Sequence, residues 1–269
     1  MAAMLLFMPM VLPAQAADAS AWDKDMHSAL RLIAAGAPRG GATTFRAGIE
    51  IRLDSGWKTY WRYPGDSGVP PRFAFAGSEN VKNVTVKWPA PHRFSDDGGQ
   101  SIGYKEYVIL PLVIEPDDAN KPVKLRLHVD YAVCAKLCVP AEGKAEVMVT
   151  RDRTAHDATL AAAEARVPER RALGDTSSLS IRAIRRDASG RIAVDLAAPE
   201  GSDVDLFAEG PTEAWAMPLP EPTPGAAAGL KRFMVTLDGL PPGATATGAT
   251  LTFTAVAGAA AIEVPYRVD

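Results

Sequence analysis

The segment that most constrains the fold of this chain is residues 123–140. Apolar side chains occupy every second position as far as residue 133, and mostly polar ones lie between them. This period of two predicts a strand with one buried face. The end of the strand carries the only two cysteines of the sequence, Cys134 and Cys138, so we expect both to lie in a tight turn.

Pro140 follows the second cysteine closely. Proline has no amide hydrogen to donate to a strand ladder, so we expect pairing to be interrupted at this residue. A second strand is then predicted to resume over residues 144–149. The cysteines would lie at the end of a hairpin and outside the core.

The spacing of the two cysteines leaves three interpretations open. A structural disulfide would close a loop of only five residues, which the chain-entropy model credits with about 2 kcal/mol, against more than about 4 kcal/mol for a bridge across a whole domain. A chain of this length buries an adequate core without cross-links, so stability alone does not explain such a bridge. A redox-active pair and a thiolate metal site are the other two interpretations.

The N-terminus has the pattern of an export signal. An apolar run over residues 4–12 is followed by Pro13 and the small-residue motif 14–16, which suits cleavage after Ala16. No Lys or Arg precedes the run. Elsewhere the chain has no stretch near the roughly 18 to 20 apolar residues of a membrane-spanning helix, so we expect an exported, soluble protein. Export to an oxidising compartment permits a disulfide.

The mature protein is accordingly predicted to begin at Ala17 and to carry one intramolecular disulfide between Cys134 and Cys138. Intact mass, measured before and after reduction and alkylation, checks both points. Alkylation should add two groups only after reduction. Two free thiols in protein isolated from an oxidising compartment without reductant would contradict the prediction.

Composition and motif content exclude several classes of function. The net charge is −3 and 47% of the 269 residues are hydrophobic, which fits neither a disordered chain nor a nucleic-acid binder. No G-x-S-x-G nucleophile elbow is present, which disfavours a serine hydrolase. The histidines lack a metal-ligand spacing, and we expect them at the surface: His27, His92, His128 and His156.

Short alternating runs separated by Gly and Pro predict an all-β chain of two domains. The expected layout is a signal peptide over 1–16, a β-sandwich over 17–153, a helical linker over 154–177 and a second, smaller β domain over 178–269. Residues 20–36 are equally compatible with a helix and a strand. Predicted strands in the first domain cover 45–53, 57–63, 72–76, 81–88, 107–114, 123–133 and 144–149. Those in the second cover 179–185, 191–197, 203–208, 232–237, 250–256 and 261–268.

Two tryptophans and one long polar segment of the first domain are further candidates for a functional role. Trp57 and Trp61 fall in a strand that is aromatic on both faces, so they pack in the core or form an aromatic wall near the cysteines. The polar, Gly-containing segment 89–103 is longer than a hairpin connection requires. Loops of this length are often functional.

Five motifs in order resemble the N-terminal periplasmic domain of DsbD-type protein-disulfide reductases, particularly the suppressor-of-copper-sensitivity branch. The resemblance covers residues 29–149. The motifs are Trp57-Lys58-Thr59-Tyr60-Trp61-Arg62, Pro64-Gly65-Asp66-Ser67-Gly68, Trp88-Pro89-Ala90-Pro91, Gly103-Tyr104, and Tyr131-Ala132-Val133-Cys134 with Cys138-Val139-Pro140.

The resemblance implies an immunoglobulin-like β-sandwich in the periplasm that acts as a relay domain of a thiol-disulfide oxidoreductase and needs no cofactor. It implies that Cys134 and Cys138 take electrons from a polytopic membrane thiol reductase and pass them to periplasmic thioredoxin-like proteins, with Cys138 as the attacking sulfur. A cap loop shields the pair in this family. The matching residues are Phe94, Ser95, Asp96, Asp97, Gly98, Gly99 and Gln100.

Supporting roles are expected for residues near the pair. Lys136 lies within the turn, where its charge would favour a thiolate. The remaining supporting residues are Tyr131, Pro140, Trp57 and Trp61. Two alternatives to the relay stay open, a Cu(I)-handling protein with Met148 beside the thiolates and a non-catalytic sandwich with a structural disulfide.

Overall fold

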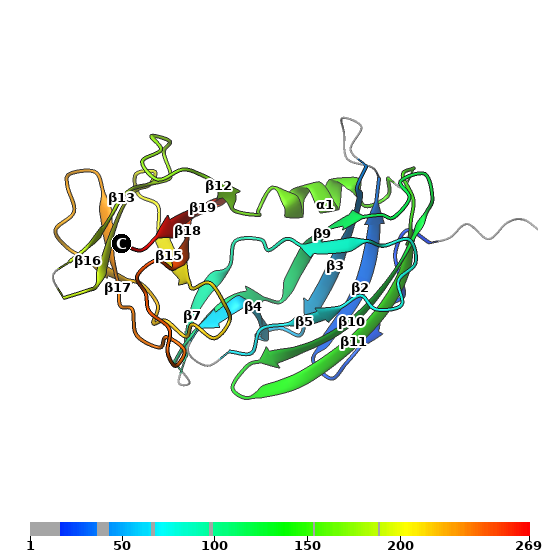
Figure 1. Ribbon diagram of the computed structural model, residues 1–269. Coiled ribbons are helices and arrows are strands. Elements are labelled where there is room, and N and C mark those ends of the chain that lie inside the picture. Colours follow the sequence, from blue (N-terminus) through cyan, green and yellow to red (C-terminus); the bar gives the residue numbers. More distant parts are fainter. Residues whose placement is uncertain (1–16, 37–42, 66–67, 97–98, 153, 188) are drawn as a thin grey trace, which may run out of the picture.

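The computed structural model describes residues 17–269 except 37–42, 66–67, 97–98, 153 and 188, so the predicted signal peptide lies outside the described residues. Strands form two sandwiches that follow one another along the chain (Figure 1). The prediction of an all-β sandwich followed by a second, smaller β domain is confirmed. Within the described part, no helix has the length and apolar character needed to cross a membrane.

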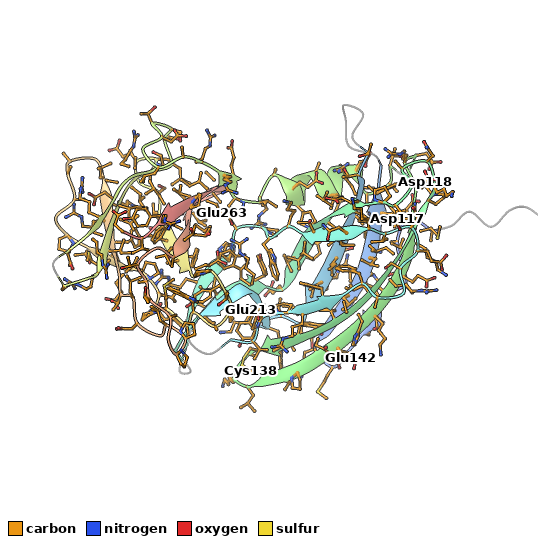
Figure 2. All side chains as sticks on the ribbon, viewed as in Figure 1. Asp117, Asp118, Cys138, Glu142, Glu213 and Glu263 are labelled. Atoms are coloured by element: carbon orange, nitrogen blue, oxygen red, sulfur yellow. A yellow bond between two sulfur atoms is a disulfide. The ribbon has the colours of Figure 1, made fainter. Side chains whose placement is uncertain are left out.

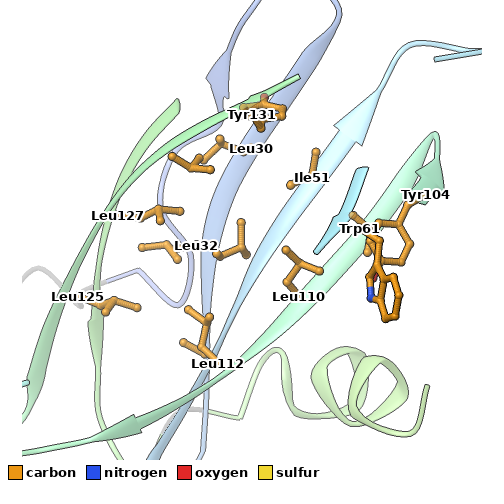
Figure 3. Packing of buried hydrophobic residues seen from close by; sticks show 14 of the residues in the cluster. Leu30, Leu32, Ile51, Trp61, Tyr104, Leu110, Leu112, Leu125, Leu127 and Tyr131 are labelled. Atoms are coloured by element: carbon orange, nitrogen blue, oxygen red, sulfur yellow. The ribbon is translucent and has the colours of Figure 1, made fainter. Parts of the chain in front are cut away.

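The first sandwich packs two antiparallel sheets against each other. One has the strand order β1 (Asp23–Lys24), β2 (Ser28–Ala35), β3 (Phe45–Leu53), β9 (Tyr107–Glu115), β6 (Asn83–Val86). The facing sheet has the order β11 (Cys138–Val149), β10 (Val123–Cys134), β4 (Lys58–Gly65), β8 (Gly99–Lys105), β7 (His92–Asp96), and β5 (Arg72–Ala74) also pairs with β10. Inward side chains of both sheets, such as Leu32, Leu110 and Leu125, fill the core between them (Figure 3).

Strand β2 resolves the ambiguity over residues 20–36 in favour of a strand. Its first half alternates between buried and half-buried positions, but its second half is buried on both faces. Leu32 faces the sandwich core, whereas Ile33 packs beneath the single described helix, α1 (Asp157–Glu164). A strand covered on both sides loses its polar alternation, which explains why the sequence pattern was ambiguous.

Helix α1 is docked on the first sandwich. Leu160 and Ala163 pack with Ile33 and Ile109, and Arg46 donates two hydrogen bonds, of 2.9 and 2.7 Å, to the carboxylate of Glu164. The chain then pairs with the second domain through β12 (Glu169–Arg170), which lies parallel to β19 (Ala260–Arg267). The residue limits of the predicted linker and of both domains stay predictions.

The hairpin β10–β11 corrects the expectation that Pro140 interrupts pairing. Strand β11 runs without a break, and Pro140 lies directly opposite Ala132 in the ladder. Pairing survives because β11 is an edge strand and, in this register, the backbone nitrogen of residue 140 points away from β10. The missing amide hydrogen of proline therefore removes no hydrogen bond from the ladder. Further along β11, two backbone amides that point away from β10 donate hydrogen bonds to carboxylates. The amide of Glu142 donates to Asp25 Oδ2 (3.4 Å), and the amide of Lys144 donates to Asp23 Oδ2 (2.7 Å).

The segment 89–103 is also corrected, since most of it is a second hairpin. Strands β7 and β8 pair in register from His92 opposite Gly103 to Asp96 opposite Gly99. The run of Gly, Ser and Asp residues has little β-propensity, which is why no strand was predicted there. Pairing with β4 through β8 supplies the neighbours that stabilise it.

The second domain packs two four-stranded sheets around its own core. One has the order β12, β19, β18 (Thr250–Ala257), β15 (Val204–Glu209), and the other β13 (Ser180–Arg186), β14 (Ile192–Ala197), β17 (Lys231–Val235), β16 (Glu221–Thr223). Six of these strands match the predicted ones to within about three residues at each end. The short strands β12 and β16 were not predicted.

The two domains share an interface. Trp61 of β4 is fully buried, with its ring centroid 5.8 Å from that of Phe207. The adjacent Arg62 pairs with Glu209 of β15, with contacts of 2.8 and 2.7 Å, and with Glu263 of β19. The interface thus combines apolar packing with adjacent ion pairs.

Candidate functional site

The cysteine pair lies where β10 passes into β11. Cys134 ends one strand, Cys138 begins the other, and the two stand directly opposite each other and form a disulfide. Three residues make the turn between them, in which the amide of Ala135 donates to the carbonyl of Leu137 (3.2 Å). Figure 2 shows Cys138 at the tip of the hairpin.

The two cysteines differ in exposure to solvent. Cys134 is 5% exposed and packs in a small cluster with Tyr60 and Ala132. Cys138 is exposed, and its neighbour Leu137 is 77% exposed. A reacting thiol from another protein therefore reaches Cys138 and not Cys134.

Tyr60 contacts the exposed member of the pair, and sequence reasoning did not single it out. Its hydroxyl lies 3.0 Å from Cys138 Sγ, although the residue is only 2% exposed. Gly68 lies against its ring, because a Cβ at Gly68 would fall 2.6 Å from Tyr60 Cδ1. A hydroxyl that donates to a sulfur favours the thiolate over the thiol.

Lys58 is a second residue that the sequence analysis missed. Strand β4 pairs with β10 so that Lys58 stands opposite Cys134, and the side chain is buried. Its Nζ donates to Ser101 Oγ at 2.8 Å. This contact directs the ammonium of Lys58 toward β8, on the side of β4 away from β10, whereas Lys136 is exposed in the turn between the cysteines.

Of the predicted cap residues, Phe94, Ser95 and Asp96 lie in β7, and Gly99 and Gln100 lie in β8. Asp97 and Gly98 lie outside the described residues. The ring of Phe94 is 5.6 Å from Lys58 Nζ and 5.1 Å from Lys105 Nζ. Since Lys58 neighbours Cys134, Phe94 lies over the face of the sheet that carries the disulfide.

A capping role for this hairpin stays a prediction. Replacing residues 95–100 with Asn-Gly would shorten the hairpin and keep a favourable two-residue turn. We expect the reduced pair to react faster with iodoacetamide in the shortened protein, because apolar and polar cover over the sulfurs is removed. Rates are measured by mass spectrometry, with an unchanged circular dichroism spectrum as control. Equal alkylation rates would show that the hairpin does not shield the cysteines.

Three aromatic residues proposed to support the pair belong to the packing of the sandwich. Tyr131 is 4% exposed and its hydroxyl lies 2.7 Å from Ser28 Oγ, and burial raises the pKa of this phenol. Trp57 stacks on His27 with ring centroids 3.7 Å apart. Trp61 lies in the core against the second domain, so the idea of an aromatic wall beside the cysteines is wrong for it.

The ligands needed for the copper interpretation are not brought together. Met148 stands opposite Lys124, ten residues along β11 from Cys138, a distance of about 34 Å at the usual strand rise. The described residues contain one cluster of metal-type donors, His128, Asp130 and Glu142, whose ligand atoms lie within 4.8 Å of one another. Lys144 Nζ already lies 2.6 Å from the Glu142 carboxylate, so this cluster is an exposed charge network.

Comparison with solved structures identifies the fold. The crystal structure of the N-terminal periplasmic domain of ScsB from Proteus mirabilis has a TM-score of 0.70 to this chain at 21% identity, covering 93% of this chain and 98% of that one. Both domains therefore share that fold. A marsupial T cell receptor chain also matches, at 12% identity over 92% of this chain and 99% of its own, but its TM-score of 0.24 carries no argument.

Sequence comparison adds a family match over part of the chain. Among curated proteins, none matches this chain. Residues 35–150 match the family described as "Thiol:disulfide interchange protein DsbD, N-terminal", a range that contains both cysteines, Lys58 and Tyr60. This part of the chain therefore matches a DsbD-type N-terminal domain.

Proposed function

We propose that this chain is a periplasmic thiol-disulfide exchange module that relays electrons from a polytopic membrane reductase to periplasmic thioredoxin-like clients. The observation that carries the proposal is the asymmetry of the Cys134–Cys138 disulfide, with one sulfur exposed at a hairpin tip and the other buried behind it. The family match and the fold shared with the ScsB domain support the same class of chemistry.

The exchange follows from this arrangement. In the reduced protein, the Cys138 thiolate attacks a sulfur of the client disulfide, forms a mixed disulfide and releases the first client thiolate. Cys134 then attacks Cys138 Sγ, which releases the second client thiolate and restores the internal disulfide. Two electrons and two protons pass to the client, and a dithiol of the membrane donor replaces them by the reverse sequence.

Tyr60 assists these steps at the exposed sulfur. The Tyr60 hydroxyl, 3.0 Å from Cys138 Sγ, donates to that sulfur when it is the attacking or the leaving thiolate. A lower thiol pKa raises the fraction of reactive thiolate near neutral pH and makes the sulfur a better leaving group.

Equilibration in glutathione buffers of graded redox potential tests the proposal. We expect the pair to titrate between dithiol and disulfide within the accessible range, and we expect the reduced protein to reduce the disulfide of thioredoxin. The redox state of each protein is read by alkylation and mass spectrometry. A pair that stays oxidised throughout, together with no reduction of thioredoxin, would leave a structural disulfide as the explanation.

A further inference from the structure

The outer face of the β10–β11 hairpin carries a ladder of residue pairs that descends from the disulfide. Side chains alternate between the two faces of a strand, and the odd-numbered residues of β10, such as Val133, are in the core. The even-numbered residues therefore face outward with the cysteines. The successive pairs, in register, are Cys134 with Cys138, Ala132 with Pro140, Asp130 with Glu142, and His128 with Lys144.

The chemistry of the ladder changes from one pair to the next. Beside the disulfide lies an apolar pair, Ala132 and Pro140, and then come two carboxylates directly opposite each other. The side chains of Asp130 and Glu142 are 67% and 54% exposed. Of the two, Glu142 is in contact with Lys144 Nζ at 2.6 Å and His128 Nε2 at 2.9 Å, whereas Asp130 lies 3.9 Å from His128 Nε2.

A groove follows the same part of the hairpin. Its volume is about 700 Å³, and it is lined by Asp130, Pro140 and Glu142 of the hairpin, by Val69 and Arg72 beside β10, and by Asp25 beside the outer edge of β11. Val69 is 55% exposed. The lining carries three carboxylates and one guanidinium, so it favours a positively charged occupant. Lys144 and His128, beside Glu142, limit this excess and also hold the pKa of that carboxyl below its usual range.

We propose that this groove binds an extended segment of the client next to its reacting cysteine, with an apolar residue two positions and a basic residue four positions from that cysteine. The inference rests on the proposed exchange function. A mixed disulfide at Cys138 fixes one point of the segment. Extended chains rise by about 3.4 Å per residue, as the hairpin does, so the second position meets Ala132 and Pro140 and the fourth meets Asp130 and Glu142.

Synthetic peptides activated as mixed disulfides with thionitrobenzoate test this specificity. Attack by the reduced protein on the peptide sulfur forms the protein-peptide disulfide and releases the coloured thionitrobenzoate anion, whose absorbance gives the rate. The peptides are Cys-Gly-Val-Gly-Lys and Cys-Gly-Val-Gly-Glu, together with the same pair in reversed order, because the ladder does not fix chain direction. At low salt we expect a lysine peptide to react about tenfold faster than its glutamate counterpart.

Matched variants assign the effect to the ladder. The double variant Asp130→Asn with Glu142→Gln should bring the lysine-to-glutamate rate ratio close to one, while Asp117→Asn, an exposed carboxylate in the turn at the far end of β10, should leave it unchanged (Figure 2). Equal rates for both peptides in the unaltered protein would overturn the inference and leave the exchange function standing. Failure to release thionitrobenzoate from any peptide would instead count against the exchange function itself.

Discussion

Cys134→Ala is expected to accumulate a covalent complex with a thioredoxin-like partner, and Cys138→Ala is expected to form little or none. The exposed Cys138 can reach a partner sulfur, whereas Cys134 is 5% exposed behind Tyr60 and Ala132. Without Cys134 the mixed disulfide on Cys138 has no internal thiol to resolve it, so the intermediate persists. Non-reducing gels of each variant, incubated with thioredoxin lacking its own resolving cysteine, measure the trapped fraction.

The two variants control for each other, because each retains one cysteine and loses the internal disulfide. Their circular dichroism spectra should therefore agree. A complex formed mainly through Cys134 would reverse the assignment of attacking and resolving sulfurs. No complex with either variant would support a structural disulfide over the relay.

Arg62→Ala is expected to lower the free energy of unfolding by about 2–3 kcal/mol, somewhat less than the loss of one partner from a fully buried ion pair. Arg62 pairs with Glu209 and Glu263, and its side chain is only 27% exposed. Burial alone would lower the pKa of this guanidinium, but hydrogen bonds and charge from the two carboxylates outweigh burial, and the pKa is raised. Removing Arg62 leaves both carboxylates in the interface without a partner.

Denaturant unfolding followed by circular dichroism and tryptophan fluorescence measures the effect. We also expect the transition to broaden or divide, because the interface that couples the domains is weakened. Lys121→Ala is a suitable control, since Lys121 forms an exposed ion pair with Asp118, 3.3 Å apart, and such pairs contribute about 0–1 kcal/mol. An unfolding midpoint unchanged in Arg62→Ala would show that the domains do not depend on this contact.

Sequence pattern predicted the strands that have one buried face and failed where burial departs from that arrangement. The alternating residues from Val123 onward predicted a strand, and the structure has β10 there, from Val123 to Cys134. The same pattern of alternation could not identify β2, because the second half of this strand packs against the sandwich core on one face and against Leu160 on the other. It placed a break at Pro140 because a proline in the middle of a sheet loses a hydrogen bond, but the edge position of β11 is a property of the whole sheet.

The site was predictable only in part for the same reason. Both cysteines and the exposed turn follow from local sequence, and Tyr60 and Lys58 lie in a motif that the family resemblance included. The register of β4 against β10 decides which residues of that motif lie beside the cysteines, and in this register Lys58 stands opposite Cys134. That register joins residues more than seventy positions apart, so it is set by tertiary packing.

The hydrogen bonds from the amides of Glu142 and Lys144 to Asp25 and Asp23 have a consequence for the behaviour of the protein at high concentration. An unpaired edge strand is a template on which another chain can add a strand, and such addition leads to aggregation. Here Pro140 offers no amide, and the next two outward amides are already occupied by negatively charged side chains. A second copy is thereby denied a strand-pairing site beside a reactive disulfide, where prolonged contact would promote covalent cross-linking between copies.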